Sequence, residues 1–272
     1  MTDPVTSVAC RTWRPWGAVE SERVIPEETA VAFTYNGGSH VVMMATPQDL
    51  DDFAVGFTLT EGIVATPEEI LRLDIVEEEI GIELRMWLGD PHAVALDERR
   101  RHMAGPTGCG LCGIESLAEA MRPTARVNDS ATATPADILV ALDALAPRQE
   151  MNRLSRAMHA AAFWQKDAAL VALREDVGRH NALDKLAGAL ARRHISAHTG
   201  LVLLTSRVSV EMVQKAAAIG APVLVAISAP TALAVRTAET AGITLVAVAR
   251  ADGFEVFTHP QRIKQDPVVH VA

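Results

Sequence analysis

The sequence predicts an α/β protein with a small α+β unit in its N-terminal part and a mostly parallel sheet in its C-terminal part. In the C-terminal half, short β-rich runs ended by polar residues alternate with helix-like segments. This alternation is typical of βαβ units, whose strands lie parallel. The chain has 272 residues and is 49% apolar, which supplies a sizeable core.

The first elements are expected between residues 24 and 60. Residues 24–45 predict a β-hairpin, because two β-rich runs flank residues 36–38, Asn-Gly-Gly, which tolerate a positive φ. The following segment predicts a helix with Thr46 as its N-cap and Pro47 at the first helical position. The apolar face of this helix consists of Leu50, Phe53, Ala54 and Phe57.

The next elements have local sequence signals. Thr66 and Glu69 have the spacing of a capping box, which predicts a second helical start. In residues 73–89, apolar and polar residues alternate, a pattern that predicts one or two β-strands. A polar connection rich in Ala, Thr and Pro leads to a helix from about Pro135 to Leu145.

The C-terminal half predicts a longer α/β unit. Its strand-like runs are 168–176, 200–206, 221–228 and 242–250, and its helix-like segments are 178–194, 207–219 and 230–241. We therefore expect three parts: an N-terminal α+β domain over 20–105, a cysteine loop and connection over 106–150, and an α/β domain over 151–272.

Hydroxyl and arginine side chains follow three of these runs. In open α/β sheets, ligands collect beyond the carboxyl ends of the strands, where helix N-termini attract anions. Those ends carry Ser206 and Arg207, then Ser228, then Arg250. They predict a site for a phosphate or diphosphate, although serine is also a usual helix N-cap.

Charge and hydropathy exclude several classes. A formal net charge of -9 opposes a broad grip on nucleic acid or on anionic lipid. The N-terminus does not have the pattern of a secretory signal, and no run is long enough for a transmembrane helix. With few cysteines, these features predict a cytoplasmic protein.

Cys109 and Cys112 lie in the glycine-rich stretch GPTGCGLCGIESL, residues 105–117, whereas Cys10 is isolated. A disulfide is improbable in a reducing compartment. A structural zinc site needs four ligands, and there is no second C-x-x-C, so we expect no metal. A redox pair remains open, although such pairs usually lie at a strand-to-helix junction. The flanking glycines favour an exposed thiol that can react with two different partners in turn, as the thiol of a sulfur carrier must.

A second polar cluster lies in LREDVGRHNALDKL, residues 173–186. Helix capping alone does not require so many charged and polar groups within a few positions, so this cluster predicts a pocket. A histidine before the apolar run at 160–163 is more typical of a buried core residue than of a site. The pocket candidates are His159, Glu175, Asp176, Arg179, His180 and Asn181.

These stretches, together with residues 41–63 and 206–235, resemble the formate dehydrogenase accessory sulfurtransferase family, FdhD. The resemblance runs from about residue 20 to FTHPQR at 257–262. It implies that a cysteine desulfurase passes sulfur as a persulfide to Cys109, with Cys112 auxiliary. It further implies delivery of that sulfur to the molybdenum bis(molybdopterin guanine dinucleotide) cofactor of formate dehydrogenase.

The resemblance also implies a cofactor-binding segment, a fold and an assembly. The C-terminal domain is expected to be similar to cytidine deaminases without their zinc, because the zinc signature is absent. A homodimer is expected, with the desulfurase and the formate dehydrogenase catalytic subunit as partners. The cofactor-binding residues are expected to be Val248, Ala249, Arg250, Ala251, Asp252 and Gly253.

Two other functions remain open. A cofactor-binding chaperone would deliver the molybdenum cofactor without moving sulfur, and its cysteines would contact a partner. A thiol-disulfide oxidoreductase would need both thiols equally.

Overall fold

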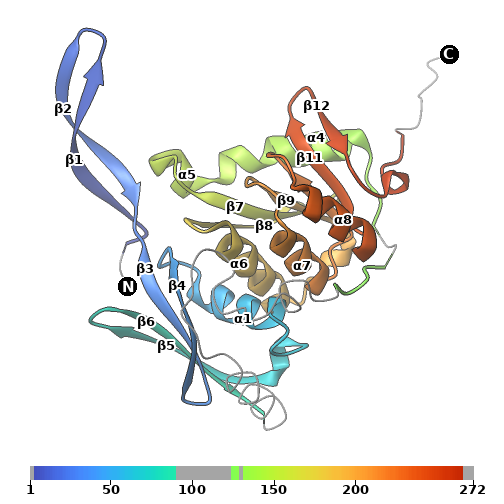
Figure 1. Ribbon diagram of the computed structural model, residues 1–272, viewed down its shortest axis with the longest axis horizontal. Helices are drawn as coiled ribbons and strands as arrows, with labels where there is room; N and C mark the ends of the chain where they lie inside the picture. Colours follow the sequence, from blue (N-terminus) through green and yellow to red (C-terminus); the bar gives the residue numbers. More distant parts are fainter. Residues whose placement is uncertain (1–2, 90–123, 129–130, 266–272) are drawn as a thin grey trace.

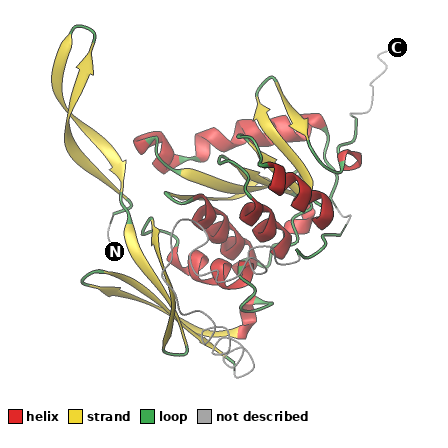
Figure 2. Cartoon of the chain, in the orientation of Figure 1, coloured by secondary structure: helices red, strands yellow, loops and turns green. Residues whose placement is uncertain are grey.

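The computed structural model of the protein describes residues 3–89, 124–128 and 131–265 (Figure 1). Three sheets and the helices that cover them make up this part of the chain (Figure 2). The strands are β1 (Val5–Arg14), β2 (Gly17–Pro26), β3 (Thr29–Tyr35), β4 (Gly38–Ala45), β5 (Ile70–Glu78), β6 (Gly81–Leu88), β7 (His159–Gln165), β8 (Ala169–Asp176), β9 (Leu201–Leu204), β10 (Val223–Ala226), β11 (Thr244–Arg250) and β12 (Gly253–Val256). The α-helices are α1 (Leu50–Thr60), α4 (Pro135–Leu145), α5 (Glu150–Ser155), α6 (Arg179–Arg192), α7 (Val210–Ala218) and α8 (Ala232–Ala241).

The largest sheet has the strand order β12-β11-β10-β9-β7-β8. Its central strands β9, β10 and β11 are parallel and are joined through α7 and α8, as the sequence predicts. The flanking pairs β11–β12, β7–β9 and β7–β8 are antiparallel. The α/β class is therefore confirmed, but the sheet is mixed and not mostly parallel. The difference arises because tight turns, which permit only antiparallel pairing, join β7 to β8 and β11 to β12.

Alternation along the central strands creates two separate apolar faces. Val202 and Leu204 pack with α6, α7 and α8, whereas Leu201 and Leu203 pack with α4 on the opposite face. Successive strand residues point to opposite faces, so each strand supplies both cores. Figure 1 shows the resulting layers, with α4 on one face of the sheet and α6, α7 and α8 on the other.

The N-terminal sheet has the order β4-β3-β6-β5 and carries α1 on one face. The predicted hairpin at residues 24–45 is confirmed as β3 and β4, which turn at Asn36 and Gly37. The predicted strands at 73–89 are β5 and β6, and the capping box at Thr66 begins a short 3-10 helix. The apolar face predicted for α1 is buried against this sheet.

The predicted start of α1 at Thr46 is wrong, because the helix begins at Leu50 after Asp49. Thr46 makes tertiary contacts instead of capping the helix. Its backbone N–H donates to Asp176 Oδ2 at 3.0 Å, its hydroxyl accepts from the Val177 N–H at 3.2 Å, and its carbonyl accepts from Lys185 Nζ at 2.8 Å. These bonds satisfy the groups that a capping residue would use.

Helices α1 and α6 cross at two glycines. A Cβ added to Gly56 would lie 1.7 Å from the Asp184 carbonyl oxygen, and one added to Gly188 would lie 1.9 Å from the Asp52 carbonyl oxygen. Backbone therefore meets backbone at this crossing, which only glycine permits. The contact joins the N-terminal sheet and α1 to the helical layer of the larger sheet (Figure 1).

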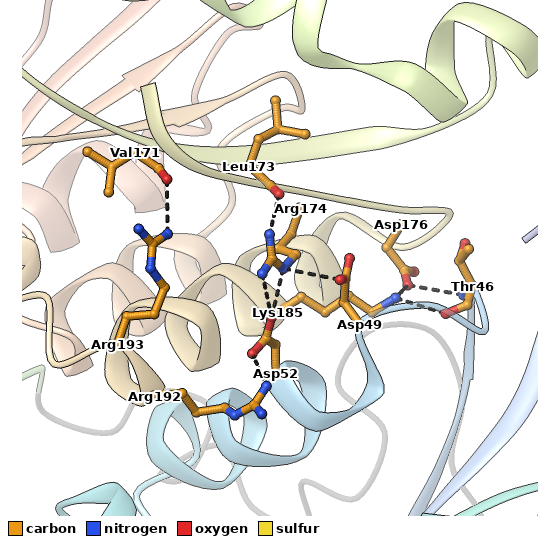
Figure 3. Close-up of polar contacts among 10 residues, drawn as sticks. All are labelled: Thr46, Asp49, Asp52, Val171, Leu173, Arg174, Asp176, Lys185, Arg192 and Arg193. Carbon is orange, nitrogen blue, oxygen red and sulfur yellow. Dashed lines mark hydrogen bonds and ion pairs between the residues drawn. The ribbon is translucent and has the colours of Figure 1, made fainter. Parts of the chain in front are cut away.

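Ion pairs lie on both sides of the glycine crossing, and Figure 3 shows those that involve Asp52. Asp52 on α1 binds Arg174 at 2.6 Å and Arg192 at 2.7 Å. On the other side, Lys215 of α7 contacts Asp184 at 2.9 Å, and Thr60 of α1 donates to the same carboxylate at 2.6 Å. The burial of these charges is offset by partners on neighbouring elements, which fixes how the elements sit together.

Strands β1 and β2 form a separate hairpin that projects from the rest of the chain (Figure 1). Trp13 is 74% exposed and Trp16 is 79% exposed at its far end. The hairpin contacts α5, where Arg23 donates to the Ser155 carbonyl at 3.3 Å. The sequence pattern did not predict these strands, although Pro15 and Gly17 mark the turn between them.

Candidate ligand-binding edge of the large sheet

One edge of the six-stranded sheet carries the polar residues singled out from the sequence. The carboxyl ends of β8, β9, β10 and β11 lie there, and so does the amino end of the antiparallel β7. From β8 to β11 this edge spans four strand intervals, about 19 Å. We call it the carboxyl edge. The cluster near residue 175 and the serine and arginine residues therefore share one edge.

Glu175 and Asp176 lie at the end of β8 and are buried. Glu175 accepts from the backbone N–H groups of Met151 at 2.9 Å and Asn152 at 2.8 Å, which satisfies the start of α5. Burial raises the pKa of Glu175, although the backbone hydrogen bonds oppose the shift. Its carboxylate therefore serves the local backbone.

Asp176 is fully buried beside Lys185, and Lys185 Nζ lies 2.6 Å from Asp176 Oδ2 (Figure 3). Asn181 donates to the other oxygen, Oδ1, at 2.9 Å and to the Met44 carbonyl at 2.9 Å. The Gly178 N–H also donates to Oδ1, at 2.7 Å. These bonds hold the turn between β8 and α6 against the end of β4.

His159 and Arg179 lie close enough at this edge for the charge of Arg179 to act on the imidazole. His159 is the first residue of β7 and pairs with Asp176 in the sheet. Burial and the positive charge of Arg179 lower the pKa of His159, and Asp176 partly opposes them. The imidazole is therefore neutral at pH 7, so it can accept or donate a hydrogen bond without adding charge.

The loops after β9 and β10 are tied together. The Val208 N–H donates to the Ala229 carbonyl at 3.3 Å, and the Thr231 N–H donates to the Val208 carbonyl at 2.9 Å. Ser206 is buried in this loop pair, whereas Arg207 is exposed. Thr231 caps α8 with its side chain, but Ser209 makes no such bond to α7. The first amides of α7 are thus left to other partners.

Residues 248–253 form the end of β11 and the turn into β12. Val248 has a φ of 52° at a bulge, and its N–H donates to the Ser228 carbonyl at 3.3 Å. Arg250 donates to the carbonyls of Ile227 and Ala249. Ala251 and Asp252 are exposed in the turn, and Gly253 has a φ of 154°. The structure therefore brings this segment beside Ser228 at the carboxyl edge.

Two predicted site residues, Cys109 and Cys112, lie outside the described residues. Within the ranges that the structure describes, no group of three His, Cys, Asp or Glu side chains is placed to hold a metal ion. No helix in those ranges is long and apolar enough to cross a membrane.

Sequence reasoning missed Glu211 and Lys215, both on α7. Glu211 Oε2 lies 3.9 Å from His180 Nε2, so the first turns of α6 and α7 meet at the carboxyl edge. Lys215 lies one turn further along, buried between Glu61 and Asp184. The only sequence signal was the polar run SRVSVEMVQK at 206–215, which also fits an ordinary amphipathic helix.

The fold and this edge define a protein of the open α/β class with polar side chains gathered at the ends of its strands, where proteins of this class usually bind ligands. The chain belongs to the FdhD/NarQ family, whose model matches residues 26–264.

Similar proteins cover most of the chain. It is 55% identical to the sulfur carrier protein FdhD of Agrobacterium fabrum over 243 residues, which are 89% of this chain and 90% of that protein. It is 48% identical to the sulfur carrier protein FdhD of Cupriavidus necator, over 96% of this chain and 91% of that one. A crystal structure described as a formate dehydrogenase accessory protein from Desulfotalea psychrophila superimposes with a TM-score of 0.77 at 25% identity, covering 96% of this chain and 100% of that one.

Proposed function

We propose that this protein is a sulfurtransferase that carries sulfur to the molybdenum cofactor and is required for formate dehydrogenase activity. The observation that carries the proposal is its 55% identity with a sulfur carrier protein over most of both chains. Cys109 and Cys112, in their glycine-rich stretch, supply the thiols such a carrier needs.

In the first step, the Cys109 thiolate attacks the terminal sulfur of a persulfide held by a cysteine desulfurase. A new S–S bond forms to Cys109, the S–S bond of the donor breaks, and the donor cysteine leaves as a thiolate. The exchange needs no external oxidant or reductant. Cys112 is auxiliary to this transfer, and the Cys109 persulfide holds the sulfur that the molybdenum cofactor would receive.

The substrate that receives the sulfur is the molybdenum bis(molybdopterin guanine dinucleotide) cofactor. Its diphosphates would meet Arg207, Ser228 and Arg250 at the carboxyl edge, with Ser206 in the adjoining loop. Residues 248–253 adjoin them. Arginine side chains and free helix amides both favour phosphate oxygens, so a chain of formal charge -9 can bind a polyanion locally.

The proposal also covers the location, the oligomeric state and the partners of the protein. We propose that it is a cytoplasmic homodimer that binds a cysteine desulfurase and the formate dehydrogenase catalytic subunit. Low cysteine content and reactive thiols both suit a reducing compartment.

The test is intact-protein mass spectrometry after incubation with a cysteine desulfurase, pyridoxal phosphate and cysteine. Wild type is compared with Cys109→Ala and Cys112→Ala. We expect a reducible gain of one sulfur atom that disappears in Cys109→Ala.

Two other outcomes would favour the alternatives. An active donor that leaves no sulfur on any variant would indicate a chaperone that delivers the cofactor without moving sulfur. Equal dependence of activity on both thiols, without persulfide, would indicate a thiol-disulfide oxidoreductase.

A further inference from the structure

The hairpin of β1 and β2 has little support from the rest of the described chain. Ten residue pairs join its two strands. It lies against α5 near its base, and its far end projects with Trp13 and Trp16 exposed (Figure 1). Isolated two-stranded hairpins are only marginally stable in water, and their edges offer unpaired backbone groups to other chains. The hairpin is therefore a candidate for contact with a partner.

The face of the hairpin that is turned toward α5 is basic and apolar. Arg23 donates to a backbone carbonyl at the end of α5 at 3.3 Å, which identifies this face. Alternate strand residues share a face, so the same face carries Val8, Arg14 and Val19, all of them exposed. Both glutamates of the hairpin lie on the other face.

The end of α5 continues this face. Leu154 is exposed next to the residue that Arg23 binds, and the arginines on either side of that pair are exposed as well. From α5 to the turn of the hairpin, the combined surface is about 20 Å long, six strand residues. We use the name arginine surface for Arg14, Val19, Arg23, Arg153, Leu154 and Arg156.

The charge of the arginine surface limits the kind of partner. Its six residues include four arginines and no acid, whereas the whole chain has a formal net charge of -9. Complementary charges steer and select protein partners, and exposed apolar side chains next to them favour contact with another protein. Tryptophan and arginine, which lie together along this hairpin, are enriched among the residues that contribute most at interfaces. A protein surface with acidic residues around apolar groups fits it.

α5 also connects the arginine surface to the carboxyl edge. The first N–H groups of α5 donate to Glu175 at the end of β8, and the chain leads from α5 into His159 at the start of β7. A partner on the arginine surface therefore lies beside the edge to which the proposed function assigns the cofactor. The partner that would use this position is the enzyme that receives the cofactor.

We propose that the arginine surface binds an acidic, partly apolar patch on the formate dehydrogenase catalytic subunit. The identity of this partner rests on the proposed function, whereas the chemistry of the surface does not. The hairpin then gains from the partner the cover that its own chain does not give it.

The experiment measures binding of the full chain to the cofactor-free catalytic subunit by biolayer interferometry, at about 50 and about 300 mM salt. We expect the affinity of wild type to fall by about threefold or more at the higher salt, because ions screen exposed charges. An affinity that does not change with salt would contradict the charge complementarity.

Two variants test the two halves of the surface. Arg153→Glu should weaken binding by about tenfold or more, because it turns a like charge toward an acidic partner. Its matched control is Arg126→Glu, an exposed arginine at the opposite edge of the large sheet, which should change the affinity by less than about threefold. Val19→Asp should also weaken binding by about tenfold or more, and its control is Val42→Asp, at an exposed valine of β4. Arg153→Glu remains decisive if Val19→Asp unfolds the hairpin.

The inference is overturned if wild type does not bind the subunit, or if either test variant binds as tightly as its control. Light scattering gives the mass of each protein, and a loss of dimer in the test variants alone would assign the surface to a second copy instead. Persulfide formation is measured on the same proteins and should not change. Its loss in the test variants alone would assign the surface to the desulfurase. Its absence in wild type would refute the sulfur carrier and leave the docking result intact.

Discussion

Replacing Gly188 by alanine should destabilise the protein, although alanine favours helices by about 1 kcal/mol over glycine. The added Cβ would lie 1.9 Å from the Asp52 carbonyl oxygen and 2.6 Å from the Asp52 carbonyl carbon. Ordinary contacts begin near 3.4 Å, so α1 and α6 must separate by about 1.5 Å.

The expected cost follows from what that separation disturbs. Overpacking itself costs about 1–3 kcal/mol. The Thr60–Asp184 bond at 2.6 Å and the bond from Lys185 to the Thr46 carbonyl at 2.8 Å would be stretched beyond hydrogen-bonding range. Bonds to charged groups contribute about 1.5–3 kcal/mol each. After the gain in helix propensity, we expect a net loss of about 3–8 kcal/mol.

The assay is urea unfolding of wild type and Gly188→Ala, followed by circular dichroism. A peptide of residues 179–193 is the control, because there alanine should increase helicity in the absence of α1. Opposite signs in protein and peptide would locate the effect at the helix crossing. Unchanged or increased stability of the whole protein would refute the close approach of α1 and α6.

Three further changes test other parts of the structure. Lys185→Met leaves the Asp176 carboxylate buried without its cation and should cost about 3–5 kcal/mol in urea unfolding; a loss below about 1 kcal/mol would contradict this ion pair. Thr231→Ala removes the cap of α8 and should lower the stability by about 1 kcal/mol, whereas Thr237→Ala, beyond the first turn of the same helix, serves as the comparison. Burial lowers the pKa of His180 to about 4, so the unfolded chain binds its proton more tightly, and the contribution of His180 to stability is lost as pH falls from about 6.5 to 4. Over this pH range, the free energy of unfolding should fall further for wild type than for His180→Gln, by on the order of 3 kcal/mol. If the unfolding free energies of the two proteins change in parallel with pH, the lowered pKa of His180 is excluded.

Much of the fold was predictable because its signals are local. The helix expected from Pro135 to Leu145 has those bounds, since Thr134 and Asp137 form a capping box. The start of α1 was not predictable from local pattern, because the groups of Thr46 bond to Asp176 and Lys185, more than a hundred positions away. The hairpin of β1 and β2 lacked a buried face, so it had little apolar alternation to reveal it.

The candidate site was predictable in composition but not in arrangement. The polar run around residues 173–186 stood out, and its members from Glu175 to Asn181 do lie at the carboxyl edge. Which of them bond inward depends on partners distant in sequence, such as Met151 for Glu175. Glu211 was missed because an acidic residue in the first turn of a helix is ordinary in any sequence.

The glycine crossing also bears on how the chain is made. Thr60 and Asp184 are 124 positions apart, so at ribosomal rates of about 5–20 residues per second α1 is finished roughly 6–25 s before its partner helix. Its apolar face is covered meanwhile by its own sheet. The face that waits displays Gly56, Asp52 and Thr60, which water solvates readily. Before α6 packs on α1, the nascent N-terminal half therefore exposes little apolar surface to chaperones or to neighbouring nascent chains.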